Sequence, residues 1–399
     1  MLKFFAPTYV ISGFVAVLVG YTSAAAIVFQ AAAAGGATPD IIASWMWALG
    51  LGMGISGIGL SLFYRVPIII AWSTPGAALL VTSLPGIPMG DAVGAFLFSS
   101  LLLTLFGVTG WFEKIMKIIP MPLASAMLAG VLVRFGLDIF VAMESRFALI
   151  ALMLVVYLAG RRFSPRYAIP ATFLAGVLMA TAEGRMGALS LDFALTLPVF
   201  TLPSFSLSTL IGVGLPLFIV TMASQNIPGV AVLRAHGYQT PASPLIAWAG
   251  AIGLPLAPFG GYAFNLAAIT AALCMGDTVH SDRDKRYPAA VWAGLFYMLL
   301  GLFGALVAGV LGMFPADLIM GIAGLALLGT IGNSLAAAVT DEDSREAAFL
   351  TFLVTASGMS LLSIGAPFWG LVIGLTAHHL LRFRPLGDIR ALFYRGPKA

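Results

Sequence analysis

Long apolar runs recur along the chain from Ile11 to Leu381, and short polar connections between them carry most of the charge. Hydrophobic residues make up 60% of the sequence and charged residues 9%, whereas a soluble domain typically has about 25% charged residues. A chain with so little polar surface cannot fold as a water-soluble globule. We therefore predict an all-α polytopic membrane protein that forms one integral unit, without a removable signal peptide.

We divide the apolar sequence into fourteen membrane segments, each with boundaries that carry an error of a few residues. In order, the segments are 12–34, 41–63, 67–84, 92–112, 120–140, 147–160, 167–182, 209–232, 242–256, 258–275, 288–311, 315–338, 347–363 and 364–382. The third and the tenth are shorter than the roughly 20 residues that a straight spanning helix needs. We expect these two segments to be broken.

The charges of alternate connections predict the orientation of the chain. With the N-terminus in the cytoplasm, seventeen of the 20 Lys and Arg residues fall on the cytoplasmic side. Arg146 and Arg185 fall outside, and Arg134 lies within the fifth segment. Because short cytoplasmic loops carry an excess of Lys and Arg, this distribution places both termini in the cytoplasm. The same scatter through loops gives no basic patch for nucleic acid.

The long polar connection 183–208 separates seven segments from seven others, and an odd number in each half forces the halves into opposite orientations. This arrangement is an inverted repeat, and weak similarity between residues 31–40 and 231–243 agrees with it. The tenth segment is then the counterpart of the third. Two interrupted segments at matching places in two halves indicate a transport site.

The third segment contains the stretch PIIIAWSTPGAALLV at 67–81, in which a β-branched run meets four residues that cap or break helices. We predict a short strand followed by a half-helix, with Ser73 or Thr74 as the N-cap and Pro75 as the first helical residue. A proline kink or a re-entrant packing element is the alternative. In the tenth segment, Tyr262 and Phe264 suit a short strand, and Asn265 is expected to cap the second half-helix.

The eighth segment has its own polar interruption, SQNIPG at 224–229. Gln225 and Asn226 would be costly if they faced lipid unpaired, so we expect them to face the interior, as a substrate wall or as helix-to-helix hydrogen bonds. Repeat symmetry aligns Ser23 of the first segment with Ser224. Gln30, two helical turns further along, is expected to be peripheral or structural.

The interiors of these four segments contain no Asp, Glu, Lys, Arg or His, so they offer no metal ligands, carboxylate pair or catalytic triad. We expect no cofactor and no enzyme. The single cysteine, Cys274, reads as a packing residue. Helix N-termini favour anions, and nearby aromatic residues suggest a ligand with an apolar or aromatic face.

Arg134 and Asp138 stand four residues apart in the fifth segment, on one helix face. Ionisable residues inside a membrane indicate function by default, so Arg134 is a candidate anion sensor and Asp138 a candidate proton acceptor. A structural ion pair at the membrane edge is the alternative.

Four stretches together carry a resemblance that covers nearly the whole chain at near-constant spacing: YRVPIIIAWSTPGAALL (64–80), MPLASAMLAGVLVRFGL (121–137), LPLFIVTMASQNIPGVAVLRAHGY (215–238) and FLVTASGMSLLSIGAPFWGL (352–371). The chain resembles the benzoate:proton symporter family, BenE, which is similar in architecture to nucleobase and sulfate permeases. The resemblance implies fourteen segments in a 7+7 inverted repeat and a homodimer in a bacterial inner membrane. It also implies a core domain (1–118 and 207–312) and a gate domain (119–206 and 313–399).

Nucleobase permeases carry a glutamate where this chain has SQNIPG, a departure that suits a carboxylate substrate. We expect an importer of an aromatic carboxylate, benzoate, coupled to protons by alternating access. The expected site has the carboxylate on the backbone N–H groups of Gly76 and Ala267, with further contacts from Ser23, Ser73, Thr74, Gln225, Asn226, Tyr262 and Asn265. The proton carrier is Asp138 or the substrate itself. The alternatives are a nucleobase or inorganic-anion permease of the same fold, a membrane-embedded enzyme and a passive channel.

Overall fold

The structure is a computed structural model that describes residues 2–111, 120–187, 194–362 and 364–382. Helices dominate it, as the composition predicts. Its first half contains η1 (Leu2–Phe5), α1 (Pro7–Ala34), α2 (Pro39–Tyr64), β1 (Ile70–Trp72), α3 (Thr74–Ser83), α4 (Met89–Thr109), α6 (Met121–Ser145), α7 (Phe147–Phe163), η2 (Pro165–Tyr167) and α8 (Ala168–Ala182).

The eighth apolar run is one helical column with two π-helical turns. It comprises α9 (Leu207–Thr209), η3 (Leu210–Gly214), α10 (Leu215–Thr221), η4 (Met222–Asn226) and α11 (Ile227–Ala235). After it come α12 (Ala242–Leu256), η5 (Ala257–Phe259), β2 (Phe264–Leu266), α13 (Ile269–Met275), η6 (Arg283–Lys285), α14 (Tyr287–Leu302), α15 (Gly304–Gly312), α16 (Ala316–Val339), η7 (Glu342–Ser344), α17 (Arg345–Ala356), β3 (Ser360–Leu361), β4 (Ile364–Gly365) and α18 (Ala366–Arg382).

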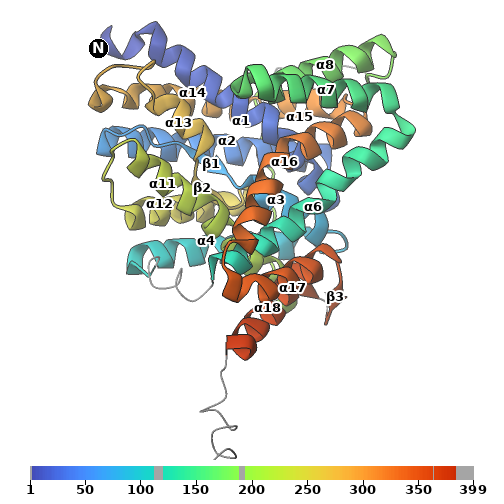
Figure 1. Cartoon of the computed structure of the whole chain (residues 1–399). Coiled ribbons are helices and arrows are strands. Elements are labelled where there is room, and N and C mark those ends of the chain that lie inside the picture. The colour runs from blue at the N-terminus through green and yellow to red at the C-terminus, as the bar shows by residue number, and fades with distance from the viewer. Residues whose placement is uncertain (1, 112–119, 188–193, 363, 383–399) are drawn as a thin grey trace, which may run out of the picture.

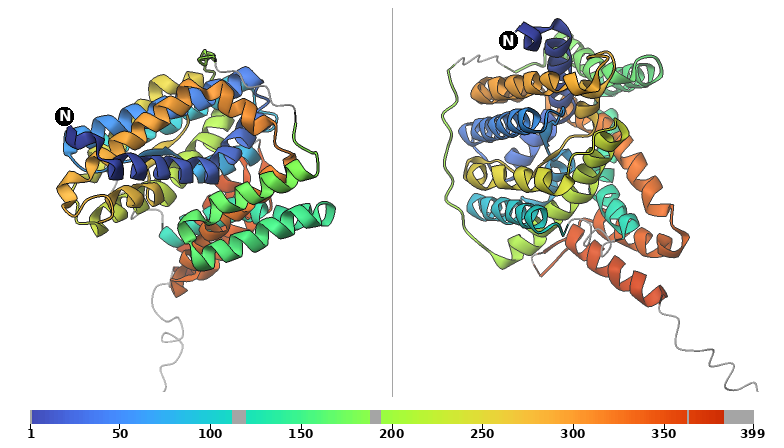
Figure 2. Two further views of the ribbon diagram at one scale, coloured as in Figure 1. Left: turned by 90° about the horizontal axis from the view of Figure 1, so that it is seen from above. Right: turned by 90° about the vertical axis from the view of Figure 1, so that its left-hand side faces the viewer.

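The helices form two groups that lie beside one another (Figure 1). The first group contains a layer in the order α14, α2, α12, α4, which Figure 2 shows from the side. Helices α1 and α13 and the 207–235 column pack against that layer, and α3 packs against α1 and the column. In the second group, α6 packs against α16 and α17, α7 packs against α8, and α17 packs against α18. Both groups draw on both halves of the sequence.

Glycines bring two neighbouring helices of the layer, α2 and α14, into close contact. A Cβ atom built on Gly50 of α2 would lie 2.5 Å from the Cα of Gly301 in α14, a distance that real Cβ atoms do not reach. One turn along, a Cβ on Gly54 would lie 2.6 Å from the carbonyl oxygen of Gly294. Small residues at such positions let membrane helices approach closely and gain van der Waals contact.

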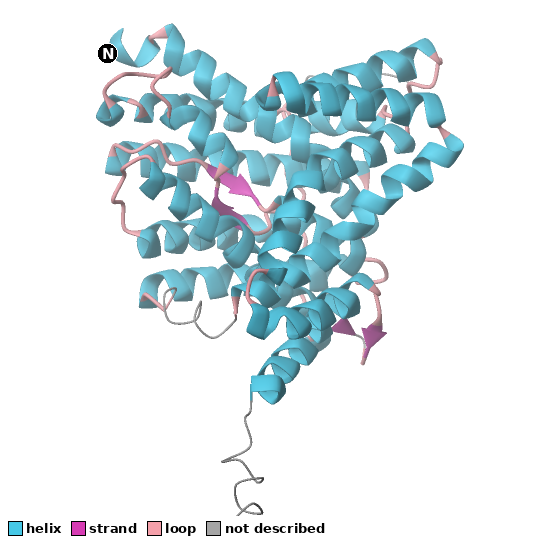
Figure 3. Cartoon of the chain, viewed as in Figure 1, coloured by secondary structure: helices cyan, strands magenta, loops and turns pink. Residues whose placement is uncertain are grey.

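Two short strands cross in the middle of the molecule, where Figure 3 shows them in magenta. β1 lies in the third apolar run and β2 in the tenth, and the two pair antiparallel with Ala71 opposite Asn265. Each strand is followed by a short helix, α3 after β1 and α13 after β2. The sequence order in both runs is therefore strand, break and half-helix.

Six helices among the described residues are long and apolar enough to cross a membrane, or up to eight if each of two bent pairs is one span. The longest of the six is the 207–235 column with 29 residues, followed by α2 with 26 and α6 with 25. The bent pairs are the two parts of α1, and residues 283–302 with α15. A helical polytopic membrane protein follows from these helices. The count of fourteen spans and the 7+7 division remain predictions.

Candidate functional site

The paired strands separate the starts of the two half-helices. Beyond the ladder, the N–H of Ser73 donates to the carbonyl of Ala263 at 3.0 Å, and the N–H of Ala267 donates to that of Ile69 at 2.9 Å. From the pair Ile69–Ala267 to the pair Ser73–Ala263, the two-stranded ribbon formed by β1 and β2 is four residues long. At about 3.3 Å per residue, the two contacts are about 13 Å apart along this ribbon. α3 and α13 therefore begin at opposite ends of the ribbon.

Ser73 caps α3, as the sequence predicts. Its Oγ accepts from the N–H of Gly76 at 3.0 Å, and the helix begins at Thr74 with Pro75 in its first turn. The helix therefore begins one residue earlier than expected, at Thr74 instead of Pro75. The side chain of Leu217 would lie 2.8 Å from a Cβ on Gly76, so the eighth run covers this end of α3 closely.

The expectation that Asn265 caps the second half-helix is wrong. Asn265 lies within β2, and α13 begins at Ile269 after Ala268 without a side-chain cap. The strand continues to Leu266 because its backbone groups pair with β1, and this pairing keeps residue 265 extended. The Nδ2 of Asn265 reaches the carbonyl of Ala263 at 3.4 Å, while its buried Oδ1 has no hydrogen-bond partner among the described residues.

The two amides of the eighth run differ in their surroundings. Asn226 is fully buried, and its Oδ1 accepts from the backbone N–H of Leu266 at 3.0 Å. Gln225 is half-buried in η4, the π-helical turn that contacts α6 of the second group. The Oγ of the neighbouring Ser224 donates to the carbonyl of Val220 at 2.5 Å. For Ser23 the structure describes the backbone, within α1, and not the side chain.

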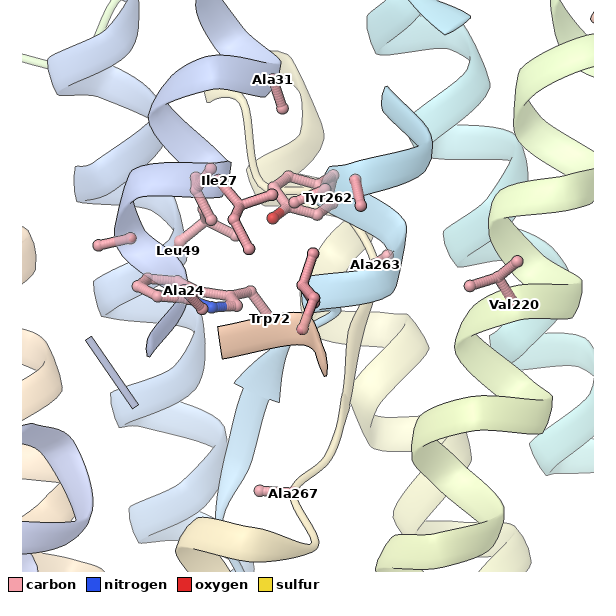
Figure 4. Close-up of a cluster of buried hydrophobic side chains, with 14 of the residues drawn as sticks. Ala24, Ile27, Ala31, Leu49, Trp72, Val220, Tyr262, Ala263 and Ala267 are labelled. Atoms are coloured by element: carbon pink, nitrogen blue, oxygen red, sulfur yellow. The ribbon is translucent and has the colours of Figure 1, made fainter. Parts of the chain in front are cut away.

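A cluster of buried apolar side chains, which includes Trp72 and Tyr262, lies beside the strands (Figure 4). The ring of Tyr262 is fully buried, with centroids 5.8 Å from Trp45 and 5.9 Å from Phe96. The ring of Trp72 packs edge-on against the ring of Tyr21, with 4.8 Å between the ring centroids. The hydroxyls of Tyr262 and Tyr21 are both buried without a hydrogen-bond partner among the described residues. Buried hydroxyls without a partner are rare in proteins, so these two are polar groups that the described part of the fold leaves unsatisfied.

Both backbone N–H groups that were expected to bind a carboxylate are already hydrogen-bonded within the protein. The N–H of Gly76 bonds to Ser73, and the N–H of Ala267 bonds to Ile69. Because the two helix starts lie at opposite ends of the ribbon, one carboxylate cannot contact both donors in this conformation. The expected arrangement of two half-helix N-termini around one anion therefore differs from the geometry seen here.

A cavity of about 650 Å³ lies between the two helix groups, away from the strand crossing. The first group contributes the end of α3, the following turn, Gln30 of α1 and the start of the 207–235 column. The second group contributes α6, including Arg134 and Asp138, Met320 of α16 and the turn between α17 and α18. None of the nine residues expected to bind substrate lines it. In the sequence, the charged residues Arg134 and Asp138 in the apolar run 120–140 indicated that this region has a function.

Arg134 and Asp138 form no ion pair within 4.0 Å in the described part of the chain. Arg134 instead reaches toward the turn after α17, where its Nη1 lies 3.6 Å from the position of a Cβ on Gly358. The alternative of a structural pair between these two side chains is thus not what the geometry shows. Across the described residues, no group of three or more His, Cys, Asp or Glu side chains is arranged to hold a metal ion.

Comparison with solved structures identifies the fold. The transmembrane domain of the cyanobacterial bicarbonate transporter BicA aligns with a TM-score of 0.59 at 12% identity and covers 94% of this chain and 97% of that one. At this identity the likeness shows the fold alone.

Comparison of sequences identifies the family. The Escherichia coli (strain K12) inner membrane protein YdcO is 49% identical over 368 residues, which are 92% of this chain and 94% of that protein. The benzoate membrane transport protein of Acinetobacter baylyi is 40% identical over 371 residues, or 93% and 94% of the two chains. The family model of the benzoate membrane transport protein, BenE, matches residues 3–380. The chain belongs to the BenE family of benzoate membrane transport proteins.

Proposed function

We propose that the protein is a secondary active transporter that imports an aromatic carboxylate, benzoate, together with a proton by alternating access. The choice of benzoate as the substrate is supported by the 40% identity, over 93% of this chain, to a protein named as a benzoate membrane transport protein. The cavity between two helix groups supports the mechanism, because alternating access moves one group against the other around a site near the midplane. An enzyme is not proposed, since relatives are named as transporters.

The proposed architecture is fourteen spans in a 7+7 inverted repeat. A pseudo-twofold that exchanges the halves would turn the α2–α14 contact, second run with eleventh, into the α12–α4 contact, ninth with fourth. It would likewise turn the α7–α8 contact into the α17–α18 contact. Both members of each pair are present, which supports the repeat. The first helix group then corresponds to the core domain (1–118 and 207–312) and the second to the gate domain (119–206 and 313–399).

The proposed substrate site lies where the strand crossing faces the gate domain. Gln225 and Thr74 are its half-buried members and offer neutral donors near the start of α3. Ser73, Gly76, Asn226, Asn265 and Ala267 shape the backbone there, and Ser23 and Tyr262 complete the wall. In this proposal the anion meets side-chain donors and the positive end of α3.

Proton coupling is proposed to use Asp138 or the substrate's own carboxyl group. Asp138 is half-buried and lines the cavity, so it has access to the transport path. Replacing Asp138 by Asn separates the two routes. Uptake that stays proton-driven in Asp138→Asn assigns the proton to the substrate, and uptake that loses its response to the gradient assigns it to Asp138.

The proposed setting is a bacterial inner membrane, with both termini in the cytoplasm and two chains paired through the gate domain. YdcO, the 49% identical relative, is named as an inner membrane protein. Accessibility of cysteines placed at Ser164 and at Gly86 would test the orientation, since the proposal puts the first inside and the second outside. Cross-linking in native membranes would test the dimer.

Uptake of radiolabelled benzoate into proteoliposomes tests the function. With an inward proton gradient we expect transient accumulation above the leak of empty liposomes, and an uncoupler should abolish it. Uracil, sulfate and bicarbonate are the competitors that would reveal a nucleobase or inorganic-anion permease. Protein-dependent flux that never runs uphill would indicate a passive channel. Absence of protein-dependent benzoate uptake would overturn the substrate assignment.

A further inference from the structure

The cavity between the helix groups has the size and the lining of a small-molecule site. Its volume of about 650 Å³ falls within the roughly 300–1,000 Å³ typical of ligand pockets. By the charge distribution of the loops, the residues around it lie toward the outer side of the membrane. These include Gly86 in the turn after α3 and Gly358 in the turn after α17. A solute arriving from outside would meet this cavity before it reached the strand crossing.

One cation stands in the cavity wall without a counter-ion. Arg134 lies within α6, a helix apolar enough to cross a membrane, and no carboxylate in the described residues lies within 4.0 Å of its guanidinium. An ionised arginine at such a place is costly unless it faces water or an anion. Its planar fork of N–H donors matches the two oxygens of a carboxylate.

The rest of the lining suits an apolar body better than a small inorganic ion. Val131 and Phe135 lie next to Arg134 on α6, and Met320 and Met359 add further apolar surface. The first turn of α18 also borders the cavity, so the positive end of that helix adds to the attraction for an anion. Asp138 is one helical turn from Arg134 and confines an anion to the arginine's other side.

We propose that this cavity is an outer docking subsite for a carboxylate with an apolar body, in which Arg134 binds the carboxylate before it moves to the strand crossing. The inference rests on the proposed transport function and adds to it a second, earlier binding place. Arg134 is the specificity-determining residue there, and Val131 and Phe135 contact the ring.

Steady-state uptake measures the contribution of Arg134. A hydrogen bond to a charged group is worth about 1.5–3 kcal/mol, so Arg134→Gln should raise the external KM for benzoate about tenfold or more and change kcat by less than about twofold. Arg134→Lys should recover part of the affinity, because it restores charge without the fork. The matched control is Arg146→Gln, which removes a positive charge on the same side but outside the cavity.

Chemical protection tests binding without relying on transport. The native Cys274 is buried, so a cysteine at Ser83, which lines the cavity, gives an almost clean background for maleimide labelling from outside. Benzoate should slow the labelling of Ser83→Cys, and adding Arg134→Gln should remove that protection. Thr82→Cys, also in the lining, serves if Ser83→Cys does not fold.

The two measurements separate the subsite from the function. Protection that depends on Arg134 without any uptake would support the subsite and overturn the transport proposal. Uptake with unchanged KM in Arg134→Gln, together with protection that survives this substitution, would overturn the subsite and leave transport standing. Protection by sulfate as strong as that by benzoate would overturn the apolar selectivity.

Discussion

The side-chain Oδ1 of Asn226 accepts a hydrogen bond from the backbone N–H of Leu266 at 3.0 Å. This contact joins the π-helical turn η4 to the edge of strand β2, across 40 residues of sequence. A short strand inside a membrane protein leaves backbone donors that β1 does not reach, and each must find an acceptor. Asn226 therefore supports the strand crossing, a role distinct from that of the neighbouring Gln225.

Alanine at these two neighbouring positions should give opposite results. Asn226→Ala leaves the N–H of Leu266 buried and unpaired, so we expect a loss of about 1–3 kcal/mol in stability and a lower thermal midpoint in detergent. Gln225→Ala breaks no hydrogen bond of this kind and should change the midpoint little, while it weakens benzoate uptake. Equal thermal midpoints for both variants and the wild type would show that the Asn226 contact is not structural.

The N-cap of α3 supports a second prediction. Ser73 is fully buried, and its Oγ satisfies the N–H of Gly76 at 3.0 Å. Ser73→Ala should cost about 1 kcal/mol or more, because loss of a cap typically costs 0.5–2 kcal/mol and this site is closed to water. Thr74→Ala is the matched control, since the neighbouring residue does not cap the helix. Thermal unfolding of the two variants in detergent checks the difference, and an equal midpoint would contradict it.

The contact between α2 and α14 makes glycine necessary at one position and dispensable at another on the same helix. A Cβ at Gly50 would meet backbone atoms of α14 at 2.5–2.7 Å, whereas a Cβ at Gly59 meets nothing within 4 Å. Gly50→Ala should lower stability by about 1–3 kcal/mol, because the helices must move apart. Gly59→Ala should be neutral or gain up to about 1 kcal/mol from helix propensity. Thermal unfolding of the pair tests the helix contact directly.

The sequence predicted the broken third run in detail because the signals there are local. Ser73, Pro75 and Gly76 fix the end of the strand, the cap and the first turn of α3 within four residues of one another. In the tenth run the same reasoning placed the cap at Asn265, three residues before Ala268. The true start depends on pairing with β1, which lies about two hundred residues earlier, and a local pattern contains no information about that register.

The site was predictable in its parts but not in its spacing. The interruption at Gln225 and Asn226 correctly marked one buried amide, that of Asn226, beside the strands. Nothing in the residues showed that Asn226 bonds to the backbone of Leu266. The cavity escaped prediction because its walls come from six separate stretches of chain. Gln30, expected to be peripheral or structural, lines the cavity together with Arg134 and Asp138.

The two arginines that the sequence predicts in outer loops share one carboxylate. Asp317, in the first turn of α16, lies 2.9 Å from Arg185 after α8 and 3.3 Å from Arg146 between α6 and α7. Glu183 lies 3.7 Å from Arg185 and adds to the cluster. The cluster connects the ends of four helices of the second group, so it should stabilise that group as a unit.

Asp317→Asn should therefore lower stability by about 1 kcal/mol, since all the side chains are partly exposed and water screens the attraction. A double-mutant cycle of Asp317→Asn with Arg185→Gln should show a coupling of about 0.5–1 kcal/mol. The cycle of Asp317→Asn with Arg146→Gln should show a smaller coupling energy, because Arg146 lies farther from Asp317 and is more exposed than Arg185. Both couplings should shrink as salt rises from 0.05 to about 0.5 M, because screening shortens the reach of surface charges. Couplings near zero at low salt would show that Asp317 does not hold these helix ends together.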